Sequence, residues 1–209
     1  MGRANSYGSG DLLLEENPQE TGDLAAEYGP SNFDIRNRLV ANFLYETAPV
    51  GSGAIVRGLS GGWQISGIFT GLSGAAYNVR DTANSYSQQR PDRVDGQDLV
   101  LDNWGDTLQY LNRAAFARVP IVTASGAQQR PGTLSRNAVR GPAIYNLDLG
   151  FGRNFAFGPS YRLQVRLDMF NALNTRNYTA LETRVENTRF GQLTAVSTRT
   201  MQLGLRFTF

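Results

Sequence analysis

Residues 143–170 read AIYNLDLGFGRNFAFGPSYRLQVRLDMF, and this stretch decides the fold. Up to Phe157, large apolar side chains occupy most odd-numbered positions, while Asn, Asp and Gly occupy most even-numbered ones. The same parity returns after the break at residues 158–160, where Tyr, Leu, Val, Leu and Met alternate with Arg, Gln, Arg and Asp. Such alternation is typical of a β-strand with one apolar and one polar face. The stretch therefore predicts two long antiparallel strands joined by a short turn.

The parity also predicts the register of this hairpin. Directly opposed residues share a face, so the numbers of paired residues must sum to an even value. The simplest solution is a three-residue loop with Phe157 opposite Tyr161. A five-residue loop would oppose Asp148 and Asp168, and like charges directly opposite each other are destabilising. We therefore predict the three-residue loop.

Three further segments alternate in the same way, which gives five expected strands. Their ranges are 36–48, 62–72, 143–157, 161–171 and 200–209. Most are at least as long as the roughly 9 to 11 residues that a tilted strand needs to cross a bilayer, and their ends are aromatic, as in a membrane girdle. The fold class predicted is all-β: an antiparallel meander of about five long strands that belongs to the wall of a transmembrane β-barrel.

The connections agree with a barrel wall. The turn at 158–160 and the link at 49–62 are short, whereas residues 73–142 and 172–199 are long. Outer-membrane barrels have short periplasmic turns and long extracellular loops. If the last strand runs inward to a periplasmic end, both short connections fall on the periplasmic side and both long loops fall outside. Arg153 alone is at odds with the pattern, because it has the apolar parity; near the turn we expect it to snorkel to water.

The composition excludes several kinds of chemistry. The chain has 209 residues, 41% of them apolar, with 23 glycines, 18% charged residues and a formal net charge of +2. All the basic residues are arginine, and histidine and cysteine are absent. This excludes a Ser-His-Asp system, an ordinary zinc site and a disulfide framework. The arginines are scattered among carboxylates, which argues against a nucleic-acid partner. We expect no enzyme activity, and no catalytic, cofactor-binding or metal-binding residue.

Several stretches resemble one family of proteins. They are GPSNFDIRNRLVANFLYE from Gly29, GGWQISGIFTGLSGAAYNV from Gly61, RNAVRGPAIYNLDLGFGRNF from Arg136, RLDMFNALNTRNY from Arg166, RFGQL from Arg189 and the terminal MQLGLRFTF. In their order and spacing they resemble the C-terminal barrel of TonB-dependent outer-membrane transporters. The most similar group is the Oar-like one, whose members also carry a carboxypeptidase-regulatory-like domain at the N-terminus.

The resemblance implies a barrel of about 22 strands, closed around an N-terminal plug and energised by TonB across the periplasm. We interpret the chain as a C-terminal fragment, with residues 1–32 an extracellular loop and truncation edge and residues 33–209 the last strands. The implied location is the cell outer membrane. The implied partners are the rest of the barrel and its plug, TonB through the missing N-terminal part, the outer-membrane assembly machinery and the lipid bilayer. The implied substrate is bulky or scarce.

Three groups of residues are candidates for function. The terminal strand resembles the signal read by the assembly machinery, carried by Met201, Leu203, Leu205, Phe207 and Phe209. Charged residues of the polar parity could line a lumen: Asp148, Arg162, Arg166, Asp168 and Arg206. Trp104 and Tyr110 in the first long loop could contact a ligand such as a sugar.

The same residues allow other interpretations. Asp148 and Asp168 could be imagined as a glycosidase pair, but a polar, hydrated wall does not favour that chemistry. The acidic loop 92–106 could bind calcium, yet its spacing differs from that of an EF-hand, and a solvated loop is favoured. Asp106 is placed to cap a short helix in residues 107–116. The alternative function is a soluble or surface-exposed β-sheet module that binds carbohydrate through its loops.

Overall fold

The computed structural model describes residues 3–4, 18–19, 23–81, 89–122, 124 and 130–209. Most of residues 1–22, part of the expected N-terminal loop, lie outside the described residues. The chain forms two compact units. Unit 1 comprises Met1–Arg36, Ser73–Ala143 and Tyr178–Val196, and unit 2 comprises Asn37–Leu72, Ile144–Asn177 and Ser197–Phe209. Across the described residues, no helix has the length and apolar character needed to cross a membrane.

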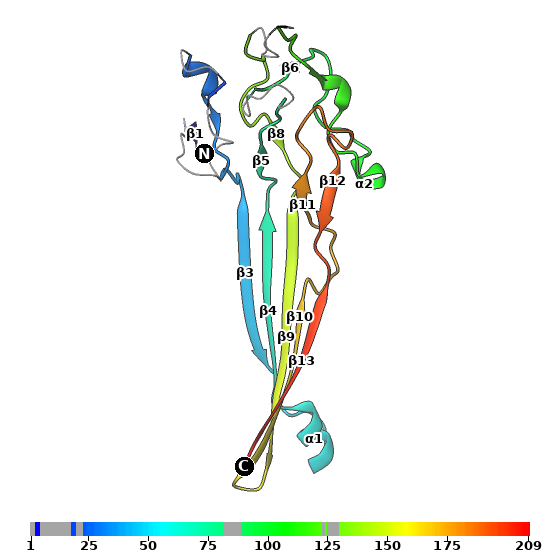
Figure 1. Ribbon diagram of the computed structural model, residues 1–209. Coiled ribbons are helices and arrows are strands. Elements are labelled where there is room, and N and C mark those ends of the chain that lie inside the picture. Colours follow the sequence, from blue (N-terminus) through cyan, green and yellow to red (C-terminus); the bar gives the residue numbers. More distant parts are fainter. Residues whose placement is uncertain (1–2, 5–17, 20–22, 82–88, 123, 125–129) are drawn as a thin grey trace. The chain divides into compact units, whose positions relative to one another are not determined.

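Unit 2 is a five-stranded antiparallel sheet, drawn as the long neighbouring arrows of Figure 1. Its strands are β3 (Arg38–Glu46), β4 (Trp63–Leu72), β9 (Ile144–Phe157), β10 (Tyr161–Phe170) and β13 (Thr200–Thr208). They lie in the order β13-β10-β9-β4-β3, which is a meander of the long strands. The prediction of an antiparallel meander of five long strands is confirmed, and each strand begins and ends within two residues of the expected range.

The register of the sheet follows the predicted parity throughout. β9 and β10 pair with Phe157 opposite Tyr161, so the three-residue turn is confirmed. Asp168 lies opposite Gly150, and Asp148 lies opposite Ile68, so the two carboxylates are not direct partners. None of the four long pairings contains a register shift. The odd-numbered side chains therefore stay on one face of the sheet, and the even-numbered ones stay on the other.

The two ends of the sheet have different connections. Arg38 pairs with Leu72, and Leu72 pairs with Ile144, so the chain leaves the sheet for unit 1 at one end. At the other end lie the β9–β10 turn and the link between β3 and β4. That link contains the helix α1 (Ala54–Ser60), which the sequence reasoning missed. A helix of seven residues offers less than two full turns of periodicity, so its apolar spacing is a weak signal.

Unit 1 is built from short elements. Its strand pairs are β1 (Arg3–Ala4) with β2 (Gly29–Pro30), β5 (Ala76–Tyr77) with β8 (Val139–Arg140), β6 (Asp92–Arg93) with β7 (Phe116–Ala117), and β11 (Tyr178–Leu181) with β12 (Leu193–Val196). Its described residues also form the helix α2 (Trp104–Thr107) and the 3₁₀ turns Ala25–Glu27 and Arg113–Ala115. The segments expected to be loops thus form a folded unit.

Unit 1 has its own hydrophobic core. The buried members are Val79, Tyr110, Leu111, Ala115, Phe116, Leu134, Val139, Tyr178, Val185, Phe190 and Leu193. They come from the two long connections between the strands of the sheet, 73–143 and 178–196. Phe116 and Phe190, one from each connection, meet edge to face with their ring centres 5.2 Å apart. Burial of these side chains stabilises the two connections against each other.

The prediction of a helix that begins after Asp106 is wrong. Asp106 lies inside α2, whose N-cap is Asn103, and the helix ends at Thr107 because Leu108 adopts a left-handed backbone conformation (φ 60°). The residues that follow bond to the second long connection instead: the Tyr110 amide donates to the Gly191 carbonyl at 2.7 Å. These backbone bonds to a distant segment replace the bonds that a helix would need.

The expectation that Arg153 snorkels to water is also wrong. Its side chain is buried at 9% relative exposure, and its guanidinium donates to the carbonyl oxygens of Gly58 and Leu59 at the end of α1. It also lies over the ring of Phe155, 4.5 Å from the ring centre. The helix that the sequence reasoning missed therefore supplies the partners that water was expected to supply.

We predict that Gly158→Ala lowers the free energy of unfolding by about 1–2 kcal/mol, because a Cβ is unfavourable in the left-handed region. Gly158 has φ +70°, and an added Cβ would meet no atom within 4 Å, so the effect is one of backbone conformation alone. The measurement is urea unfolding of the protein in phospholipid vesicles, followed by tryptophan fluorescence. Ser160→Ala in the same turn is the control. Equal stability of the two variants would contradict the assigned turn.

Candidate functional site

The even-numbered face of the sheet is hollowed. A hollow of about 530 Å³ lies over the middle of β3, β4, β9 and β10. Its lining includes the even-numbered side chains of Asn42, Leu44, Ser66, Ile68, Asp148, Arg166, Asp168 and Phe170. A second hollow, of about 220 Å³, is lined by Glu46, Gln64, Asn154, Gln164 and Arg166, among other residues. The polar face is thus concave at the strands that carry the predicted lumen-lining charges.

Two of those charges form an ion pair within β10. The Nε atom of Arg166 lies 2.8 Å from one carboxylate oxygen of Asp168 and 3.0 Å from the other. Gly150 lies opposite Asp168 and Gly152 lies opposite Arg166, so the neighbouring strand places no side chain over the pair. A Cβ on Gly150 would come within 3.2 Å of the Asp168 carboxylate. The glycines keep the charged pair open to the hollow.

Asp148 has a structural role on the same face. Its Oδ1 atom accepts hydrogen bonds from the Asn146 side chain at 2.8 Å and from the Asn171 backbone amide at 2.9 Å. Asn171 adopts a left-handed conformation (φ 52°) directly after β10. The carboxylate therefore fixes the turn that follows β10, besides lining the hollow.

The remaining lumen candidates lie nearer the β9–β10 turn. Arg162 pairs with Ala156 and Thr208, and Arg206 pairs with Gln164, so both have the parity of the hollowed face. Both are exposed. All five predicted lumen-lining residues therefore share one face of the sheet, as their parity requires.

The predicted assembly residues lie on the opposite face. Met201, Leu203, Leu205 and Phe207 belong to β13 and are exposed, and Phe209 follows directly after the strand. The ring of Phe207 stacks on that of Tyr161 with a centroid distance of 6.1 Å. β13 lies at an edge of the sheet, where one side of its backbone is open among the described residues.

Trp104 and Tyr110 lie in unit 1, where they pack against its core. Their ring centres are 5.4 Å apart, and Trp104 also meets Tyr178 edge to face at 6.0 Å. The Tyr110 hydroxyl donates to the Arg140 carbonyl at 2.6 Å, and burial raises its pKa above the ordinary value. Tyr110 is 6% exposed, so the structure gives it a packing role. Contact of these two residues with a ligand stays a prediction.

The acidic loop is held by an arginine. Both oxygens of Asp92 accept from Arg130 at 2.7 Å, and one also accepts from the Thr133 amide at 3.0 Å. The Arg130 hydrogen bond is the main cause that holds the pKa of Asp92 below its usual value. Within the described ranges, no group of three or more acidic residues is gathered in a way that could hold a metal ion.

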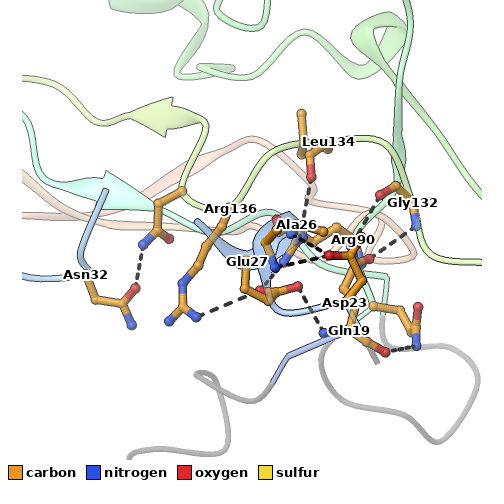
Figure 2. A network of polar contacts seen from close by, with 12 residues as sticks. Gln19, Asp23, Ala26, Glu27, Asn32, Arg90, Gly132, Leu134 and Arg136 are labelled. Atoms are coloured by element: carbon orange, nitrogen blue, oxygen red, sulfur yellow. Dashed lines mark hydrogen bonds and ion pairs between the residues drawn. The ribbon is translucent and has the colours of Figure 1, made fainter. Parts of the chain in front are cut away.

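A buried ion cluster in unit 1 was not predicted. Figure 2 shows Glu27 between the guanidinium groups of Arg90 and Arg136. Its Oε2 atom lies 2.7 Å from Arg90 and 3.8 Å from Arg136, and all three side chains are at most 2% exposed. Arg90 also donates to the Leu134 carbonyl at 2.8 Å. The cluster joins three segments that are far apart in the sequence.

Gln19 completes this cluster. Its backbone N–H donates to Glu27 Oε1 at 3.1 Å, while its side-chain oxygen accepts from the backbone N–H groups of Arg90 and Gly132. Gln19 and Glu27 are therefore bound to Arg90, Gly132 and Arg136 through buried and partly buried polar contacts. No local pattern in the sequence signals these contacts, since the partners are separated by 63 residues or more.

The sequence reasoning also missed the apolar residues of the hollow. Leu44, Ile68 and Phe170 have the polar parity but carry large apolar side chains. The signal was present, because consecutive apolar residues such as Phe43-Leu44 and Ile68-Phe69 interrupt strict alternation. Such a run indicates a strand with apolar contacts on both faces.

Comparison with known proteins identifies the class. The family model for the outer membrane beta barrel domain matches residues 2–202. No curated protein and no solved structure gives a significant match. The chain belongs to the outer membrane beta barrel domain family, and its location is the cell outer membrane. In such a barrel the apolar face meets lipid and the polar face meets the lumen, which here are the odd-numbered and the hollowed even-numbered faces.

We predict that Glu27→Gln lowers the local stability of unit 1 by about 3–5 kcal/mol, because it leaves two buried arginines without their carboxylate. The measurement is hydrogen exchange of the backbone amides of residues 132–140. The control is Glu182→Gln, whose partner Arg184 has a side chain 49% exposed, and a change of at most about 1 kcal/mol is expected there. Similar exchange rates in the two variants would contradict the role given to the cluster.

The Asp92–Arg130 contact predicts a pH dependence. The pKa of Asp92 is lowered in the folded protein. The stability that its ionised carboxylate contributes is therefore present above the unfolded pKa of about 4, and it is lost as the pH falls through the lower folded pKa. We expect the NMR signal of the Thr133 amide, in protein labelled at threonine, to shift as the pH falls below about 4. In Asp92→Asn this titration should be absent. A titration that persists in the variant would assign it to another group.

Proposed function

We propose that this chain forms the C-terminal part of a TonB-dependent outer-membrane transporter of the Oar-like group, which takes up a bulky or scarce substrate. The observation that carries the proposal is the hollowed polar face with the open Arg166–Asp168 pair in its lining. A lumen wall of this kind offers charge, hydrogen-bonding groups and an apolar patch to whatever occupies the barrel. The sequence motifs that resemble this group, quoted above, supply the finer identity.

The direction of the edge strands supports a larger wall. β3 and β13 are the outer strands of a five-stranded antiparallel meander, so they run in the same direction. Bacterial single-chain outer-membrane barrels have an even number of antiparallel strands. An odd number of further strands must then join β3 to β13. Copies of this chain alone would meet through parallel seams, which favours closure by other strands of one longer protein.

The folded unit 1 supports a receptor function. The connections expected to be extracellular share a core and a buried ion cluster. A pre-ordered surface loses less conformational entropy on binding than flexible loops do. In this proposal unit 1 takes part in substrate capture, TonB and a plug act through other parts of the protein, and the odd-numbered residues of β13 are read by the assembly machinery.

The proposal includes no catalysis, cofactor or metal. The charged residues of the hollow are assigned to substrate passage or to contact with a plug. The alternative, a carbohydrate-binding β-sheet module, gains no support from unit 2. A soluble sandwich would need a second sheet over Leu147, Leu149, Leu163 and Val165. Unit 2, all of whose residues are described, contains one sheet only.

The test is the energy dependence of uptake. We predict that a strain lacking the gene and a strain lacking TonB lose uptake of the same labelled nutrient from a panel of substrates too large for porins. A protonophore should abolish the same uptake in the parent strain. The control is a small sugar that enters through porins and is unaffected in both deletions. Uptake that depends on the gene but persists without TonB would overturn the proposal and indicate a passive channel.

A further inference from the structure

α1 is fixed to the lipid-facing side of the sheet. Its contacts come from the odd-numbered residues Thr47, Trp63 and Arg153. Arg153 donates to the carbonyls of Gly58 and Leu59. It lies over the rings of Phe155 and Trp63, 4.5 and 5.3 Å from their centres. The helix therefore lies against the apolar face, at the end of the sheet where the β9–β10 turn is found.

These contacts satisfy the end of the helix. The last four carbonyls of an α-helix lack partners within it. In α1 the Leu59 carbonyl also accepts from the Trp63 indole at 2.9 Å, and the Ser60 carbonyl accepts from the Thr47 hydroxyl at 2.9 Å. The Arg153 guanidinium places a positive charge at the C-terminal end of the helix, where the helix dipole favours it. The attachment therefore holds this short helix in place.

The rest of α1 leaves apolar side chains uncovered. Ile55, Val56 and Leu59 are 78%, 52% and 62% exposed. At 100° per residue they lie on one side of the helix, and Arg57 lies on the opposite side. Val50, just before the helix, is exposed as well. This arrangement is that of an amphipathic helix with no protein partner within its own unit.

We propose that α1 is an interfacial helix, whose apolar side inserts into the boundary between headgroups and acyl chains of the leaflet at the turn end of the sheet. The occupant of this surface is phospholipid, because α1 continues the face that already meets lipid in this family. Aromatic rings surround the same end, among them Trp63, Phe155 and Tyr161, as in the interfacial girdle of a barrel. By covering Arg153, α1 allows an arginine on a face where an uncovered charge is costly.

The experiment uses the absence of cysteine from the sequence. Ile55→Cys and Arg57→Cys are labelled with an environment-sensitive fluorophore in the full protein, in vesicles of phosphatidylethanolamine and phosphatidylglycerol. Spin labels are placed on the lipid either just below the headgroup or near the acyl-chain end. We expect the probe at Ile55 to be quenched about two-fold more by the shallow spin label than by the deep one. The matched probe at Arg57 should be quenched mainly by aqueous iodide.

Two outcomes would overturn the proposal. The first is equal iodide quenching of both probes with no effect of the lipid spin labels, which would place the helix in water. The second is a probe at Ile55 that is shielded in native outer membranes but exposed in the vesicles, which would assign the surface to a periplasmic protein. Arg153→Met should reduce the shallow quenching at Ile55, with barrel folding checked by heat-modifiable gel migration. Unchanged quenching would show that Arg153 does not hold the helix.

Discussion

The unbroken hydrogen-bond ladder of the long sheet is the constraint on which the rest of unit 2 depends. In a hydrocarbon environment no water is present to satisfy a free amide or carbonyl, so only closed barrels and helices can span it. The four pairings from β3 to β13 run without a bulge or slip. A slip of one residue would move every apolar side chain to the lumen face. Continuity of the ladder therefore keeps lipid and lumen surfaces separate.

The side chains of Arg153 and Phe170 are among those that depart from the alternation between the two faces. Arg153 has lipid-face parity, and its charge is covered by the end of α1 and by two aromatic rings. Phe170 has lumen-face parity and lies in a hollow beside the Arg166–Asp168 pair. Arg153 thus has partners for its charge, whereas Phe170 adds apolar surface to a polar hollow and is 49% exposed. The departures mark the parts of the sheet that do more than form a wall.

The sequence predicted those parts of the structure whose information is local. The five strands follow from parity, because a period of two repeats within each strand. The turn between Phe157 and Tyr161 follows from parity together with the unfavourable opposition of Asp148 and Asp168 in a longer loop. The faces of all five lumen candidates follow from the same rule. α1 was missed because seven residues that include Gly58 and are followed by Gly61 and Gly62 give little periodic signal. The cluster of Glu27, Arg90 and Arg136 was missed because its members share no local pattern.

Different interactions therefore stabilise the two units. Unit 2 depends on many equivalent backbone bonds, so the loss of one side chain leaves its ladder intact. Unit 1 depends on a small core and on one buried carboxylate that faces two arginines, all at most 2% exposed. Removing one member of a buried charge cluster is costly, and the backbone amide of Gln19 is bound to the same carboxylate. In the first long connection, sequence change at positions 90 and 136 is thus limited by this cluster rather than by the membrane.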